Sequence, residues 1–238
     1  MNKIFNYIED IINDLINPNI KLKDVLLKVQ VLAYELKNEK LKNWVDCEIN
    51  GYGQMDIEKF PKYRVIQTSV HGNLIQNFGF GSFSNLTNYT LPIEHLDEKI
   101  VKRLSFHCFN NPVSEIENLS TKEKGILKVS VPVFIYPEIE KIIESNCNIH
   151  QAWQQINISS LVGILESIKS YLLKFILELK QEMGDNNEID ITKLKIDKLF
   201  DKIIANDKNF VLNISNTNIR SDKLNYINGN DNIQEINS

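Results

Sequence analysis

Residues 44–64 read WVDCEINGYGQMDIEKFPKYR, and the spacing of the apolar residues changes inside this stretch. Up to Ile49 these residues recur at helical spacing, and Gly51 is typical of a helix end. An extended run begins after Pro61, at Tyr63. The stretch therefore predicts a helix followed by a strand, which places the chain in the α+β fold class.

Upstream of this stretch the sequence predicts two more amphipathic helices. One apolar stripe lies within residues 4–16 and another within 22–36, and Asn17-Pro18-Asn19 separates them. The third helix follows within residues 41–49. Because short connections favour antiparallel neighbours, we expect an N-terminal three-helix unit.

Downstream, the pattern predicts a small, mostly antiparallel sheet, a long closing helix and a C-terminal helix with an Asn-rich β tail. The extended runs expected in the sheet are 63–70, with Gly72 as a turn, 73–83 and 125–133, and the expected helices are 95–104, 138–144, 161–179 and 192–204. A polar linker at 184–187 marks a boundary. We therefore expect an α+β domain over residues 1–183 and a separate C-terminal part over 184–238.

The C-terminal part has the composition of a self-associating segment. Residues 210–215 alternate with a period of two, and Asn228-Gly229 is a hairpin-turn signal. Asn-rich β segments can pair with identical copies, because each amide bonds to the same amide above and below it. This predicts a homo-oligomer, and the alternative is a plain polar tail.

Charge and cysteine content exclude several classes of protein. Charged residues make up 24% of the chain and the net charge is -4, so no basic excess points to nucleic acid as a partner. Three cysteines, Cys47, Cys108 and Cys147, are too few for a disulfide framework and indicate reduced thiols. The apolar stretch 161–179 carries Glu and Lys residues that a bilayer span does not tolerate. We therefore expect a cytoplasmic protein with no membrane partner.

A group of polar residues lies around the change of period: Glu48, Asn50, Tyr52 and Arg64. In one interpretation they are structural, with an ion pair between Glu48 and Arg64 beside a core anchor at Trp44. In the other, the four polar residues bind a ligand at the junction between helix and sheet.

The same residues resemble a known family. Leu32-Ala33, the segment from Trp44 to Tyr52, and Pro61-Lys62-Tyr63-Arg64 are similar to the motifs of the AbiTii domain, and the long helix fits that family's closing helix. The resemblance covers roughly residues 1–182. It implies a role in bacterial abortive infection against phage, as a toxin or effector module. It supplies no established catalytic residue.

Ribonuclease chemistry is the enzymatic alternative. Nucleases of the HEPN type present an Arg and a His a few residues apart on a helix, and the spacings of Arg64 with His71 and Arg103 with His107 are close to that pattern. The first pair falls on a predicted strand, while the second falls on the predicted helix 95–104 and just after it.

Metal and phosphate sites have weaker signals. His107-Cys108 and the Cys147 to His150 segment are the only close Cys and His groups in the sequence, without a second pair at zinc-site spacing. The glycines of Gly79-Phe80-Gly81 lack the Lys-Ser/Thr and the helix of a phosphate loop. We therefore predict no catalytic residue, no cofactor and no metal.

Together these observations predict a non-enzymatic effector or toxin that acts by self-association or by binding a host or phage component. The alternatives are a nuclease toxin, a structural adaptor whose tail docks a protein partner from the same defence locus, and a sensor of a nucleotide second messenger.

Overall fold

A computed structural model describes residues 3–53, 55, 57–121, 125–143, 146–183, 193–204 and 233–236. The chain forms two compact units, each built from separate stretches of sequence. The helical unit comprises residues 1–64, 110–121 and 161–226, and the sheet unit comprises 65–109, 122–160 and 227–238. The boundary expected at 183/184 adjoins residues that lie outside the described ones, and it stays a prediction.

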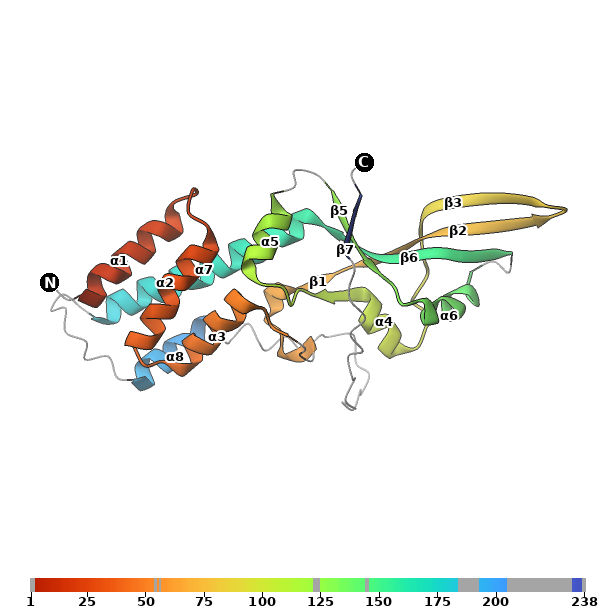
Figure 1. Ribbon diagram of the computed structural model, residues 1–238. Coiled ribbons are helices and arrows are strands. Elements are labelled where there is room, and N and C mark those ends of the chain that lie inside the picture. The colour runs from red at the N-terminus through yellow and green to blue at the C-terminus, as the bar shows by residue number, and fades with distance from the viewer. Residues whose placement is uncertain are drawn as a thin grey trace. The chain divides into compact units, whose positions relative to one another are not determined.

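The helical unit contains the three predicted N-terminal helices and most of the long closing helix (Figure 1). Its elements are α1 (Lys3–Ile16), α2 (Leu22–Glu35), α3 (Glu39–Asn50), the short 3-10 helices η1 (Ile57–Lys59) and η2 (Lys62–Arg64), α5 (Val113–Ser120), α7 (Ile158–Met183) and α8 (Lys193–Ile203). The sequence pattern did not predict α5.

The core of the helical unit follows the predicted apolar stripes. On α7 the buried residues recur every three or four positions, as a helix packed along one face requires. They are Leu161, Ile164, Leu165, Ile168, Leu172, Phe175, Ile176, Leu179 and Met183. Val162 lies off this face and is 44% exposed.

Side-chain caps tie distant helices of this unit together. The backbone N–H of Leu22 at the start of α2 donates to Glu117 Oε1 on α5 at 2.7 Å. Asn38 caps α3, because its Oδ1 accepts from the backbone N–H of Leu41 at 2.8 Å. The amide nitrogen of the same Asn38 donates to Asp197 on α8 at 2.7 Å, so α8 packs within the helical unit.

The sheet unit is antiparallel throughout its strand pairs, as predicted. Strands β1 and β4 form a two-stranded sheet, and the larger sheet has the order β3-β2-β6-β5-β7. The elements are β1 (Val65–Gln67), β2 (Ser69–Gly79), β3 (Ser82–Thr90), α4 (Glu98–Ser105), β4 (Phe106–Cys108), β5 (Ile126–Ser130), the 3-10 helix η3 (Val133–Ile135), α6 (Tyr136–Glu140), β6 (Cys147–Asn157) and β7 (Ile233–Ile236).

The expected turn at Gly72 was wrong, because this glycine lies inside β2. A Cβ at Gly72 would stand 2.8 Å from the carbonyl oxygen of Gln151 on β6, so the glycine is needed for close approach of two strands. The turn that does end β2 comprises Gly79, Phe80 and Gly81, all with positive φ. The central strand β6 was not predicted.

The predicted strand over residues 63–70 is interrupted twice. Its first residues belong to η2, and Thr68 separates β1 from β2. Thr68 bonds to the end of α4 instead, through its hydroxyl to the carbonyl of Leu104 and through its N–H to the carbonyl of Ser105, both at 2.8 Å. These bonds place the start of β2 beside α4.

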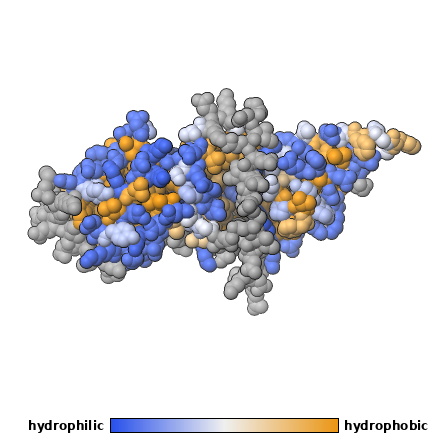
Figure 2. All heavy atoms as spheres, viewed as in Figure 1, coloured by the Kyte–Doolittle hydropathy of each residue, from blue (hydrophilic) through white to orange (hydrophobic). Residues whose placement is uncertain are grey.

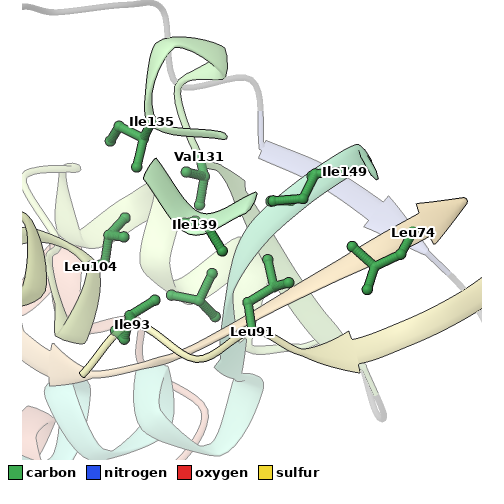
Figure 3. Close-up of a cluster of buried hydrophobic side chains, with 10 residues drawn as sticks. Leu74, Leu91, Ile93, Leu104, Val131, Ile135, Ile139 and Ile149 are labelled. Atoms are coloured by element: carbon green, nitrogen blue, oxygen red, sulfur yellow. The ribbon is translucent and has the colours of Figure 1, made fainter. Parts of the chain in front are cut away.

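A cluster of buried apolar residues lies between the large sheet and the helices of the sheet unit (Figure 3). Strands β2 and β6 contribute residues such as Leu74 and Ile149, while α4 and α6 contribute Leu104 and Ile139. The remaining members are Val70, Leu91, Ile93, Val131, Ile135 and Ala152.

The tail contributes strand β7, which pairs with β5 from Ile126 opposite Ile236 to Val129 opposite Ile233. The predicted Asn228-Gly229 hairpin and the alternating run 210–215 lie outside the described residues.

Replacing Gly51 by Ala should destabilise the helical unit by about 2 kcal/mol or more. Gly51 has φ 91°, and a Cβ there would stand 2.6 Å from the carbonyl oxygen of Asn110. Gly53 is the matched control, because it has φ 57° with nothing within 4 Å of a Cβ, so Gly53→Ala carries only the conformational cost. Urea unfolding followed by tryptophan fluorescence measures both variants, and equal losses would contradict the close-approach explanation.

Candidate functional site

Helix α3 and the turn after it place three of the site's side chains. Trp44 and Glu48 lie one turn apart on the buried face of α3. Gly51 then ends the helix with positive φ, and the N–H of Tyr52 donates to the carbonyl of Asn110 at 2.9 Å. The turn therefore directs Tyr52 back toward the helix that it follows.

A buried ion pair is the centre of the site. Glu48 and Arg64 are each 0% exposed, and Arg64 Nη2 lies 2.5 Å from Glu48 Oε2. Arg64 Nε lies 3.4 Å from the other carboxylate oxygen, Oε1, while Nη1 donates to the carbonyl of Asn111 at 2.8 Å. One guanidinium thus connects α3, η2 and the segment before α5, as the structural interpretation of the sequence predicted for Glu48 and Arg64.

Two tyrosines and a tryptophan complete the arrangement around the carboxylate. The hydroxyls of Tyr52 and Tyr63 both donate to Glu48 Oε1, the latter at 2.6 Å. Trp44 Nε1 in turn donates to the Tyr63 oxygen at 2.9 Å. We call Trp44, Glu48, Tyr52, Tyr63 and Arg64 the Glu48 cluster.

Ring contacts close the Glu48 cluster on its apolar sides. Arg64 Cζ lies 4.7 Å from the centroid of the Tyr52 ring, a cation–π distance. Phe60 packs on the same ring with centroids 5.6 Å apart, and Tyr171 of α7 packs on Tyr63 at 5.7 Å. Aromatic rings thus pack against both tyrosines of the cluster.

Burial sets the protonation of the cluster. It raises the pKa of Tyr52 and Tyr63 well above that of a free tyrosine, and the neighbouring Glu48 carboxylate adds to the shift. Burial also opposes the charge on Arg64, but Glu48 outweighs it and the pKa of Arg64 is raised. Both phenols are thus protonated donors at neutral pH, and the guanidinium is charged.

The structure brings together three of the four residues proposed for ligand binding: Glu48, Tyr52 and Arg64. Asn50, the last residue of α3, is exposed to solvent. Tyr63, which was not among the four predicted residues, takes part in the cluster instead. Since solvent does not reach Glu48 or Arg64, the evident contribution of these side chains is to hold three chain segments together. Ligand binding at these positions stays a prediction.

The Arg and His pairs of the nuclease alternative are placed separately. Arg64 is buried against Glu48, whereas His71 lies on β2 with Nε2 3.0 Å from Ser69 Oγ. Arg103 lies on α4, but this helix ends at Ser105 and His107 lies on β4, packed edge-on against Phe109. Neither pair is therefore presented on one helix.

The described residues show neither a metal-ligand group nor a membrane-spanning helix. No three Asp, Glu, His or Cys side chains in this part of the chain gather closely enough to hold a metal ion. None of the helices described is both long and apolar enough to cross a bilayer. Gly79 and Gly81, considered above as a phosphate loop, form the β2–β3 turn with no helix after it.

Comparison with known protein families finds a match over most of the chain. The family model described as AbiTii matches residues 6–202, which include the whole Glu48 cluster and extend the expected range of about 1–182 into α8. No curated protein and no solved structure matches the chain. The matched family indicates an abortive-infection role against phage.

Replacing Glu48 by Gln should lower the free energy of unfolding by about 3–5 kcal/mol, because Arg64 would keep a buried charge without its counter-ion. Asp201→Asn is the matched change in an exposed pair of the same unit. Lys40 and Asp201 lie 2.5 Å apart with side chains 45% and 51% exposed, and breaking this pair should cost about 0.5 kcal/mol. Denaturant unfolding measures both variants, and similar small losses would show that the buried pair contributes no more than a surface one.

The raised pKa values of Tyr52 and Tyr63 predict a loss of stability at high pH. The folded protein holds these two protons while the unfolded chain releases them near pH 10, so the free energy of unfolding falls as the pH rises above about 10. This loss of stability is absent below the pKa of the tyrosines in the unfolded chain, and it is complete once the pH exceeds their pKa in the folded protein.

Tyrosinate ultraviolet absorbance measures this titration directly. We expect two of the eight tyrosines to ionise only when the protein unfolds, and we expect the Tyr52→Phe/Tyr63→Phe variant to lose that late fraction. Ionisation of all eight in the folded protein near pH 10 would contradict the assignment.

Proposed function

The chain belongs to the AbiTii family, and on that premise we propose that it is a non-enzymatic effector of abortive infection that acts through a protein-binding surface on α2. The surface would engage either a second copy of the chain or a host or phage component. The observation that carries this proposal is an exposed apolar stripe on a helix whose opposite side is already buried.

The stripe consists of Leu27, Val31 and Tyr34, which are 42%, 49% and 58% exposed. Their spacing of four and then three residues places them on one face of α2. The other side of the helix fills the core with Leu22, Val25, Leu26, Val29, Leu32 and Ala33. A helix that is apolar on both sides is typical of one with a partner on each side, and Figure 2 shows apolar residues gathered on this unit.

Charged side chains border the stripe, as they do at the rim of many protein interfaces. Lys28 pairs with Asp14 of α1 at 2.5 Å, and Lys42 Nζ of α3 lies 4.5 Å from the centroid of the Tyr34 ring. An apolar centre containing an aromatic residue, with a charged border, favours a protein partner.

The Glu48 cluster supports this function indirectly. It holds α3, η2 and the segment at Asn110–Asn111 in fixed positions, and α2 packs on α3 and α5. The binding helix is therefore carried on a rigid support, so binding needs little ordering of the free protein. Binding of a different protein at this surface and self-association through it are separated by the variants that follow.

Val31→Asp/Tyr34→Asp should abolish protection against phage while leaving the fold intact, because two carboxylates on the stripe oppose burial in an interface. Ser170→Asp is the control, because it adds a charge at an exposed position of α7 in the same unit. Cells that carry this variant should be protected against phage as well as cells that carry the wild type. The measurements are efficiency of plating and solution mass.

Wild-type oligomers that the double variant converts to monomers would assign the stripe to self-association. A monomeric wild type whose protection is lost in the double variant would assign it to a different protein. Full protection by the double variant would overturn the proposal.

A further inference from the structure

The end of the β2–β3 hairpin projects beyond the rest of its sheet. Strand β2 pairs with β6 as far as Gln76, and the N–H of Asn77 still donates to the carbonyl of Asn146 at 2.8 Å. Beyond Asn77 the register continues with β3 alone, to Gly79 opposite Ser82. Figure 1 shows the two strands running past the end of β6. We call residues 77–83 the hairpin tip.

Three phenylalanine rings stand in solvent at the hairpin tip. Phe78 is 58% exposed, Phe80 is 112% exposed and Phe83 is 61% exposed. Apolar colour marks the end of the hairpin in Figure 2. Exposed single apolar residues are ordinary, but three exposed aromatic rings on one projecting turn are a concentration of apolar surface of the kind that marks interaction sites.

The backbone conformation of the turn is also unfavourable for a phenylalanine. Phe80 has φ 51° and lies between Gly79 at φ 80° and Gly81 at φ 78°. Asn or Gly adopts positive φ in a tight hairpin turn with little strain, whereas a bulky side chain does not. Because the ring of Phe80 is fully exposed, no contact inside the protein compensates for this strain, and strain of this kind points to function.

The charge pattern favours lipid over protein as the partner. Between Val65 and Ile93 the sequence contains no Asp, Glu, Lys or Arg, although such residues make up 24% of the chain. The α2 stripe, in contrast, is bordered by charged side chains. A charged residue is costly to move toward a bilayer interior, whereas neutral Asn, Ser and Thr side chains can hydrogen-bond at headgroup depth.

We propose that the hairpin tip docks on the surface of a lipid bilayer, with the three phenylalanine rings entering the interfacial region. Insertion is shallow, because the unpaired backbone groups of a turn must stay hydrated at the headgroups. Such contact needs no spanning helix, so it revises the expectation of no membrane partner, which considered only helical spans. The proposal is independent of the α2 surface.

Vesicle flotation with the full chain tests the docking. Wild-type protein should float with phosphatidylcholine vesicles and equally well with vesicles containing phosphatidylglycerol, and added salt should not release it, because the tip is uncharged. Phe80→Ser should weaken partitioning about tenfold, and Phe78→Ser/Phe80→Ser/Phe83→Ser should abolish flotation. Val162→Ser/Leu177→Ser removes exposed apolar surface from α7 instead, where the two side chains are 44% and 47% exposed, and should float like the wild type.

A tryptophan at the tip reports the contact itself. Trp44 and Trp153 are only 4% and 2% exposed, so a blue shift of Phe80→Trp fluorescence on adding vesicles would come from the new ring. No shift and no flotation of the wild type would overturn the proposal. Binding that requires anionic lipid and disappears in salt, or that the α7 variant loses equally, would also overturn it.

Discussion

The ion pair between Glu48 and Arg64 is the constraint on which the helical unit depends. Both side chains are fully buried, so each charge has lost its water and must be matched by the other and by further hydrogen bonds. The carboxylate oxygen Oε1 accepts from Tyr52 and Tyr63, and Arg64 reaches the carbonyl of Asn111. Satisfying these groups fixes where α3, η2 and the start of α5 meet.

This internal arrangement explains why the residues that carry the family resemblance need not contact a partner. The Glu48 cluster is closed to solvent at its charged centre, so its residue types are accounted for by the hydrogen bonds and ring contacts that they make with one another. The two surfaces that we propose for recognition lie elsewhere, on the exposed face of α2 and at the hairpin tip. One is bordered by charges and the other lies in a charge-free stretch, which suits them to different partners.

The sequence predicts the helices and the ion pair better than it predicts the sheet. Apolar residues at helical spacing located α1, α2, α3, α7 and α8. The ion pair was indicated by Glu48 and Arg64, which flank the point where the spacing of apolar residues changes from helical to extended. Strand β6 was missed because a register shift opposite Asn73 and Leu74 breaks its alternation, and because it buries the polar Gln154. Tyr63 was missed as a cluster member because only the folded chain brings its hydroxyl to Glu48.

A double-mutant cycle tests most directly whether the buried pair acts as one unit. The free energies of unfolding of Glu48→Gln, Arg64→Met and the double variant give the coupling energy between the two side chains. We expect a coupling of about 2–3 kcal/mol, with the double variant more stable than the two single losses imply, because no buried charge is left unmatched. Losses that add to within about 0.5 kcal/mol would show that Glu48 and Arg64 contribute independently, and the pair could not then be what holds the three segments together.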